Sequence, residues 1–189
     1  REKYRKFFID NNLLKKIKVP FIKIASGELT NLDLIDYISK MKIPMMISTG
    51  MTSISEISKV VEIVQSNNCP FSLLHCISSY PAKHSDANLS TIPQLQKTFD
   101  IPVGFSDHSL GIDISLAAVA LGATIIEKHF TLDKNMPGAD QKLSIDPNEL
   151  SNLVKKQADG TIEFDWQRYE ETIRKTTRFL DNIIDVNNY

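Results

Sequence analysis

The sequence is poor in glycine and cysteine and has no long apolar run, and each shortage excludes a class of protein. Glycine occurs 7 times in 189 residues, and neither G-x-G-x-x-G nor G-x-x-x-x-G-K is present, so the chain cannot build a glycine-rich phosphate loop. No apolar run approaches the ~20 residues of a membrane span. The two cysteines, Cys69 and Cys76, offer no disulfide framework, and we expect a reducing, cytoplasmic compartment.

The sequence has no excess of positive or negative charge. The chain has 22 Lys and Arg against 23 Asp and Glu, a formal net charge of −1, which leaves no electrostatic footprint for nucleic acid or an anionic membrane. We therefore expect neither as a partner. The apolar fraction of 42% is ordinary for a globular domain, and the length is sufficient to bury a core. The first residue is Arg1 rather than Met, so we expect a fragment or a processed product.

A recurring pattern, in which a proline precedes a short apolar run, organises most of the chain. Proline is tolerated at the first position of a strand, and short apolar runs are typical of strands buried on both faces. A fifth run, at 123–130, has the same shape without the proline. The prolines that lead the other four runs are Pro20, Pro44, Pro70 and Pro102.

Amphipathic segments long enough for helices separate these runs. Residues 31–41 and 52–66 repeat apolar positions with a helical period, and residues 111–121 are nearly all apolar, which predicts a helix pressed against a sheet. Ser53 and Glu56 have the spacing of a capping box. Strands alternating with helices predict parallel βα units, and the pattern contains about five of them.

Polar residues gather where each predicted strand ends, which favours one α/β architecture. In a (β/α)₈ barrel the carboxyl ends of all strands carry the chemistry, whereas an open doubly wound sheet binds ligands at a crevice between a few strands. Five polar strand ends in succession favour the barrel. Because a full barrel needs about 250 residues, we expect a partial TIM barrel with roughly three further units upstream of Arg1.

His108 and His129 end consecutive predicted strands and form the sharpest candidate pair. Strand alternation places Ser106 with His108 on one face, and Glu127 with His129 on one face. Two imidazoles with water and a carboxylate suit a divalent metal such as Mn²⁺, Fe²⁺ or Zn²⁺. The alternative is that each histidine only makes hydrogen bonds at the end of the barrel.

Lys23 lies inside an apolar run, where an ammonium is costly unless it is paired. It is either an anion clamp for phosphate or carboxylate, or the partner of a neighbouring carboxylate such as Glu28. The hydroxyls of Ser26, Ser48 and Ser106 offer further anion donors, although single serines are more often turn or cap residues.

Two loop residues are weaker candidates. Tyr80 precedes Pro81 in a rigid element that could shape a sugar pocket or serve structure alone. Asp140 closes the turn sequence PGAD at 137–140 and could reach a polar substrate from the loop.

Together these motifs resemble the N-acetylneuraminate (sialic acid) synthase family. The likeness covers about residues 19–155 and rests on ordered strings with consistent spacing: KIASGE at 23–28, STGM at 48–51, LHC at 74–76, YP at 80–81, GFSDH at 104–108, EKHFTLD at 127–133 and PGAD at 137–140.

The resemblance implies a TIM barrel transferase that condenses phosphoenolpyruvate with an N-acetylhexosamine such as N-acetylmannosamine. The products are a nonulosonic acid and phosphate. It implies that His108 and His129 bind a divalent metal, with Mn²⁺ favoured over Mg²⁺ or Co²⁺. It also implies substrate-binding roles for the KIASGE and serine motifs and catalytic roles at the sugar end. The residues that hold phosphoenolpyruvate are then Lys23, Ser26, Ser48 and Ser106, and those that face the sugar are Tyr80, Glu127 and Asp140. Glu28 is a further substrate-binding candidate, and the catalytic candidates are Lys23, Tyr80 and Glu127.

The sequence departs from the family pattern in three places. The earlier strands, with a catalytic glutamate and a further lysine, cannot be placed in it. Gln141 stands where many members have His. The small C-terminal antifreeze-like domain, which in the family reaches into the partner's site, is not recognisable. The resemblance still implies a homodimer for the complete protein.

The end of the chain has a different character, so we divide the sequence into a barrel part, 1–156, and a tail, 157–189. A polar linker at 157–163 precedes an amphipathic helix predicted at 165–186. Phe164-Asp165-Trp166 and the run at 179–185 resemble a short helical segment of the ribonucleotide reductase large chain. That likeness covers about 30 residues and does not set the function.

Two other functions compete with the synthase. One is a condensation of the 3-deoxy-octulosonate phosphate type, against which the strings at 23–28 and 127–129 argue. The other is a non-catalytic fragment that binds a ligand or a partner chain.

Overall fold

Five parallel strands in sequential order form a curved sheet in the computed structural model, which describes residues 19–158. The strands are β1 (Ile22–Ile24), β2 (Met45–Ser48), β3 (Phe71–Cys76), β4 (Val103–Asp107) and β5 (Ile126–Lys128). The helices are α3 (Leu32–Ser39), α4 (Ile54–Ser66), α5 (Thr91–Phe99), α6 (Asp113–Ala120) and α7 (Pro147–Ala158), with short 3₁₀ turns η1 (Ser26–Glu28) and η2 (His84–Asp86). The partial (β/α)₈ architecture predicted from the sequence is confirmed.

The prolines lie at the strand starts, where their carbonyls accept hydrogen bonds and no N–H is needed. Pro44 has no N–H to donate, but its carbonyl accepts from Ile22 N at 2.8 Å. The carbonyls of Pro70 and Pro102 accept in the same way from Met45 N at 2.9 Å and Leu73 N at 3.2 Å. Each proline therefore directly precedes a strand, and its carbonyl accepts a hydrogen bond from the neighbouring strand before it in sequence.

The helices follow the sequence signals closely. Ser53 caps α4, and both hydrogen bonds of the predicted capping box with Glu56 are present. Five consecutive residues of α6, Ile114–Ala118, are buried, which confirms the expected helix pressed against the sheet. Strand β1 ends at Ile24, and the small and polar residues after it form the turn η1 at 26–28.

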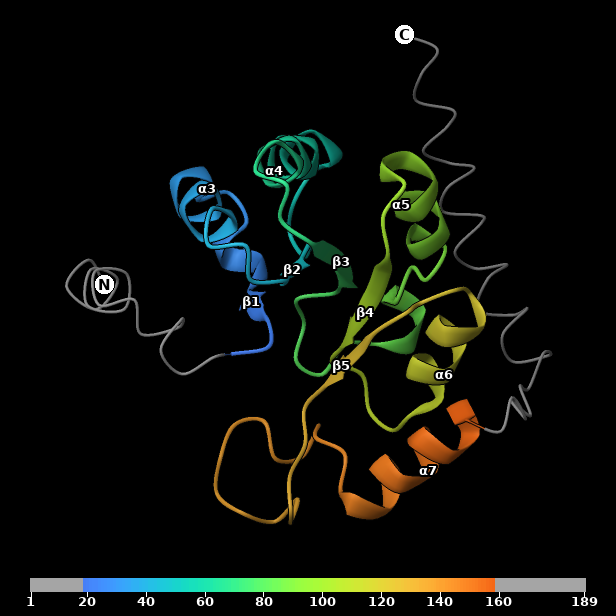
Figure 1. The fold of residues 1–189 in the computed structure, drawn as a ribbon. Coiled ribbons are helices and arrows are strands. Elements are labelled where there is room, and N and C mark those ends of the chain that lie inside the picture. Colours follow the sequence, from blue (N-terminus) through green and yellow to red (C-terminus); the bar gives the residue numbers. More distant parts are fainter. Residues whose placement is uncertain (1–18, 159–189) are drawn as a thin grey trace, which may run out of the picture.

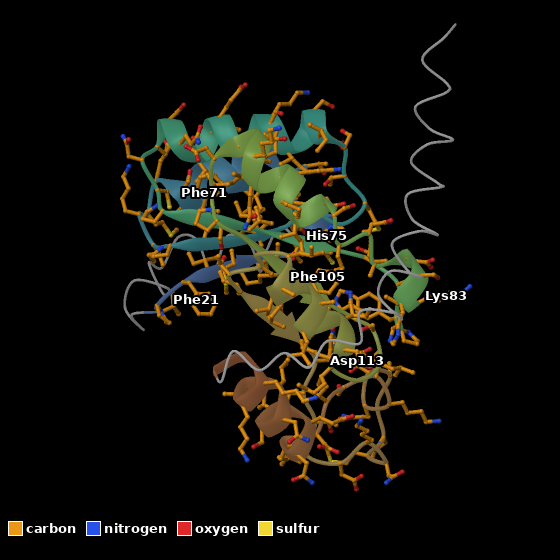
Figure 2. The ribbon with its side chains drawn as sticks, turned by 90° about the vertical axis from the view of Figure 1, so that its right-hand side faces the viewer. Phe21, Phe71, His75, Lys83, Phe105 and Asp113 are labelled. Atoms are coloured by element: carbon orange, nitrogen blue, oxygen red, sulfur yellow. The ribbon has the colours of Figure 1, made fainter. Side chains whose placement is uncertain are left out.

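The two faces of the sheet have different surroundings. One face packs against the helices through a single apolar core that includes Ile47, Leu73, Val103 and Phe105. Figure 1 shows α3, α4, α5 and α6 arranged around the outside of the curved sheet. His75 and Phe105, labelled in Figure 2, are register partners on this helix-facing side.

The last described elements extend this arrangement beyond β5. Helix α7 packs against α6 through Leu116, Ile145 and Leu153, a second and smaller apolar cluster. No helix within residues 19–158 has the length and apolarity to cross a membrane. The helix predicted at 165–186 lies outside the described residues. The first two residues of the linker predicted at 157–163 belong to α7, and the rest of that linker also lies outside the described residues.

Candidate active site

Strand register places the candidate side chains on the concave face of the sheet. Cys76 of β3 pairs with Ser106 of β4, and Ser106 pairs with Glu127 of β5. Parallel register partners point to the same side of a sheet. The hydrogen bond that Ser106 Oγ donates to Glu127 Oε1, at 2.7 Å, confirms that these two side chains share a face.

Lys23 meets the same carboxylate from the other edge of the sheet. Its Nζ lies 3.2 Å from Glu127 Oε2, and both side chains are partly exposed. The partner is therefore Glu127 and not Glu28, because curvature of the sheet brings β5 across toward β1. The carboxylate of Glu28 instead accepts a hydrogen bond from Asn31 Nδ2 at 3.0 Å, within the exposed turn after β1.

Three rings cluster just beyond the ends of β4 and β5. The ring centroids of His108 and His129 lie 5.4 Å apart, and the ring of Tyr80 lies 4.1 Å from that of His108 and 5.7 Å from that of His129. Strand alternation predicts that the two histidines face the same side, and the short distance between their rings agrees. Tyr80 comes from the loop after β3, so three consecutive βα units contribute to the cluster.

The orientation of the His108 ring is fixed by the backbone. Nδ1 of His108 lies 2.8 Å from the carbonyl oxygen of Ile77. A carbonyl only accepts, so Nδ1 carries the proton and Nε2 keeps a lone pair when the ring is neutral. Burial lowers the pKa of His108, but the Cys76 thiol, the Ile77 carbonyl and the Asp107 carboxylate outweigh it and raise the pKa overall.

Cys76 joins the histidine to the serines. Burial raises the pKa of its thiol, but hydrogen bonds with His108, Ser26 and Ser106 outweigh that effect and lower it. The Sγ atom lies 3.9 Å from His108 Nδ1. Lys23, Glu127, Ser106 and Cys76 therefore belong to one connected polar group that reaches His108 through Cys76.

The serines expected to bind an anion line the ends of β1 and β2. Ser26 Oγ accepts a hydrogen bond from Gly50 N at 3.0 Å. Ser48 is buried, and its Oγ has no hydrogen-bond partner within the described part of the chain. A buried hydroxyl without a partner is costly, which fits a group whose partner belongs to a ligand.

Asp140 approaches the histidines from the loop after β5. Its Oδ2 lies 3.7 Å from His129 Nδ1, and the side chain is half exposed. Gln141 contacts the hydroxyl of Thr131, which ties the loop to the segment that follows His129. Burial raises the pKa of Tyr80, and the charges of Cys76, Asp140 and Glu127 raise it further, so the phenol keeps its proton at neutral pH.

Sequence analysis assigned no role to two features that lie next to the site: the Asp107–Lys128 ion pair and the backbone carbonyl of Ile77. Asp107 and Lys128 form a buried ion pair at 2.8 Å on the helix-facing side, directly before His108 and His129. Strand alternation could have predicted the ion pair, because it places Asp107 and Lys128, two residues of opposite charge, at helix-facing positions of neighbouring strands. The contact between the Ile77 carbonyl and His108 could not be predicted from the sequence, because every residue has a backbone carbonyl.

The side chains present fit a divalent metal with an open coordination sphere. His108 offers Nε2, His129 is its ring neighbour, and the Asp140 carboxylate is nearby. Within residues 19–158 no three His, Cys, Asp or Glu side chains are placed to hold one metal ion together. The two imidazoles are therefore the candidate protein ligands, and the other coordination positions would belong to water or substrate.

Comparison with known proteins agrees with this arrangement. The model of the NeuB family matches residues 9–162, which is most of the chain. The chain belongs to the NeuB family. The match extends a few residues past the end of the likeness seen in the sequence and leaves most of the tail uncovered.

The relatives of this chain include synthases of several sugar acids. The N,N′-diacetyllegionaminic acid synthase of Campylobacter jejuni is 46% identical over 145 residues, which cover 75% of this chain and 43% of that protein. The N-acetylneuraminate-9-phosphate synthase of Mus musculus is 46% identical over 143 residues, covering 75% of this chain and 40% of that protein. The chain thus spans about two fifths of the length of these relatives.

A solved structure from the same family shares the fold. The N-acetylneuraminic acid synthetase of Leptospira borgpetersenii superposes with a TM-score of 0.76 at 41% identity, covering 87% of this chain and 60% of that one.

Proposed function

We propose that this chain forms part of the active-site barrel of a synthase that condenses phosphoenolpyruvate with an N-acetylhexosamine. The product is a nonulosonic acid, with phosphate released. The observation that carries the proposal is the 5.4 Å approach of the His108 and His129 rings, on the same sheet as the partly exposed Lys23–Glu127 pair. This arrangement places candidate metal ligands beside a cation suited to an anionic substrate.

The anionic substrate binds at the β1 and β2 side of the group. Phosphoenolpyruvate carries a phosphate and a carboxylate, and an ammonium with several hydroxyl donors is suited to both. Lys23 supplies the positive charge, and Ser26, Ser48 and Ser106 supply hydroxyls. The unpartnered Oγ of Ser48 supports this assignment, because a bound anion would satisfy it.

The sugar binds at the ring cluster. Tyr80 is more than half exposed and covers one face of His108, which suits the apolar face and edge hydroxyls of a hexosamine. Asp140 lies beside His129 with a partly exposed carboxylate that can accept from sugar hydroxyls. Glu127, between Lys23 and Ser106, lies where the two substrates meet.

The reaction joins two carbons and releases phosphate. C3 of phosphoenolpyruvate bonds to the aldehyde carbon of the sugar, the carbonyl π electrons move to the aldehyde oxygen, and positive charge develops at C2. Water adds to C2, and one of its protons goes to the former aldehyde oxygen, which becomes a hydroxyl. The tetrahedral intermediate then loses phosphate by C–O cleavage, and its C2 hydroxyl proton leaves with the phosphate, which gives the 2-keto acid. Lys23 and the serine hydroxyls hold the anion through these steps, and Glu127 lies near the charge that forms at C2.

A divalent cation, Mn²⁺ by preference, would be held by His108 and His129. When bound it supplies Lewis-acid polarisation of the aldehyde oxygen. The neutral Nε2 of His108, held outward by the Ile77 carbonyl, is the donor atom suited to it.

The test measures binding and turnover separately. Isothermal titration calorimetry of the chain with Mn²⁺ and with phosphoenolpyruvate detects the two sites, and a coupled phosphate assay in the protein that carries this chain detects catalysis. We expect binding of both ligands and phosphate release that depends on N-acetylmannosamine, its 6-phosphate or a diacetamido sugar.

Three results would contradict the proposal. Binding without phosphate release in that protein favours a non-catalytic ligand-binding role. Turnover only with a phosphorylated aldose that lacks an N-acetyl group favours the 3-deoxy-octulosonate phosphate type. No binding of either ligand favours a fragment that only contacts another chain.

A further inference from the structure

A buried ion pair lies on the opposite side of the strands from the two histidines. Asp107 at the end of β4 and Lys128 at the end of β5 are register partners, and their side chains are 1% and 3% exposed. The Nζ–Oδ2 distance is 2.8 Å. An ion pair removed so completely from water persists only when its remaining polar atoms are also satisfied.

Hydrogen bonds satisfy both partners. Asp107 Oδ1 accepts from the backbone N of Ser109 at 2.8 Å and from its Oγ at 2.6 Å. Asp107 Oδ2 also accepts from Ser115 Oγ of α6 at 2.5 Å. Lys128 Nζ donates to the Ser109 carbonyl oxygen at 2.8 Å. The ion pair therefore links four parts of the chain: the end of β4, the end of β5, the residues that directly follow β4, and helix α6.

These contacts bracket the candidate metal ligands. Asp107 and Ser109 are the residues directly before and after His108, and both are held by the pair. Lys128 directly precedes His129, whose carbonyl oxygen accepts from Ile145 N at 2.8 Å. His108 and His129 are the first residues after strands β4 and β5, and each directly follows a member of the pair. Holding Asp107 and Lys128 on the helix side therefore fixes the points from which the two imidazoles leave the sheet on the other side.

We propose that Asp107 and Lys128 are positioning residues that set the separation and direction of the His108 and His129 rings. The ring arrangement is a property of the chain alone, whereas its use in holding one divalent cation rests on the proposed function. An ion pair that served stability alone would be replaceable by an apolar pair of similar size, since such replacements are often neutral or stabilising. A positioning pair would not be replaceable without loss of the ring geometry.

The experiment compares the parent chain with the double variant Asp107→Leu/Lys128→Met, which keeps the buried volume and removes the polar links. Nuclear Overhauser effects between the rings of residues 108, 129 and 80 report geometry in the metal-free chain, and calorimetry reports Mn²⁺ affinity. We expect a folded double variant that loses the ring–ring effects and binds Mn²⁺ about tenfold more weakly or worse, as for other losses around metal ligands. The matched control, Asp36→Leu/Lys40→Met, removes an exposed ion pair of α3 and should change neither readout.

The outcomes separate this proposal from the proposed function. A double variant that retains both the ring–ring effects and the parent's Mn²⁺ affinity overturns the positioning role. A parent that shows the ring contacts but does not bind Mn²⁺ contradicts the metal site, while loss of the contacts in the variant still supports positioning. If circular dichroism shows the double variant unfolded, Ser115→Ala decides: weaker ring–ring effects support the proposal, and unchanged ones overturn it.

Discussion

Lys23 and Glu127 form an ion pair at 3.2 Å, although they belong to the first and last strands of the five-stranded sheet. A flat sheet would hold these strands roughly 19 Å apart, at about 4.8 Å per strand spacing. The contact therefore records how strongly the sheet curves. Its concave side carries a lysine, a glutamate and several serines.

Replacing Lys23 tests whether this cation binds the substrate anion. In Lys23→Met we expect phosphoenolpyruvate affinity to fall about 10- to 100-fold, because a hydrogen bond to a charged group contributes about 1.5–3 kcal/mol. The free energy of unfolding should change by less than about 1 kcal/mol, since a partly exposed ion pair contributes little. Calorimetry and urea denaturation measure the two quantities. Lys40→Met is the control, and parental affinity in Lys23→Met would show that Lys23 serves only as the partner of Glu127.

Removing either imidazole tests the metal site. We expect His108→Ala and His129→Ala each to abolish measurable Mn²⁺ binding by calorimetry, because two protein ligands leave none to spare. In the protein that carries this chain, metal-dependent phosphate release should disappear as well. His84→Ala, in the loop after β3, should bind Mn²⁺ as the parent does. Activity that survives thorough removal of metal ions would refute the metal role of both histidines.

Two glycines provide a matched test of the serine end of the site. A Cβ at Gly50 would lie 2.4 Å from Ser78 Oγ and 2.8 Å from Ser26 Oγ, whereas a Cβ at Gly27 meets nothing within 4 Å. Gly50→Ala must therefore displace both Ser78 and Ser26, and we expect phosphoenolpyruvate affinity to drop about tenfold, the loss of roughly one good hydrogen bond. Gly27→Ala should bind like the parent in the same titration. Equal affinities for the two variants would exclude Ser26 from the anion site.

His75 gives a prediction for stability against pH. Burial lowers the pKa of its ring, which outweighs the hydrogen bond to the Ala87 carbonyl. Below the ordinary histidine pKa of about 6.5, the unfolded chain binds a proton that the folded chain does not, so the folded state loses stability as pH falls below that value. The raised pKa of His108 acts in the opposite direction, and the comparison must therefore be made against a variant.

The variant for this test is His75→Gln, which removes only the ionisable ring. Between about pH 5 and pH 7, urea unfolding of the parent should lose more stability on acidification than unfolding of His75→Gln. Identical slopes for the two proteins would mean that His75 ionises as freely in the folded state as in the unfolded chain.

Much of the fold was predictable because it depends on local chemistry. Proline lacks an N–H and is tolerated at the start of a strand but not in the middle of a sheet, so Pro44, Pro70 and Pro102 indicate the strand starts from the sequence alone. The Ser53–Glu56 capping box lies within one helical turn, and the pairing of His108 with His129 follows from strand alternation and the order of the strands. These features need only neighbours in sequence or in consecutive βα units.

The amino-acid order alone determined the βα repeat, the helix-facing and concave faces, and the set of polar strand ends. Tertiary structure decided which of those ends meet: Lys23 pairs with Glu127 and not with Glu28, the Ile77 carbonyl orients His108, and Ser48 is left without a partner among the described residues. The reason is physical. The alternation of side chains along a strand determines which face of the sheet each side chain occupies. Contacts across the concave side depend instead on how strongly the sheet curves. That curvature is set by the packing of all the helices against the sheet.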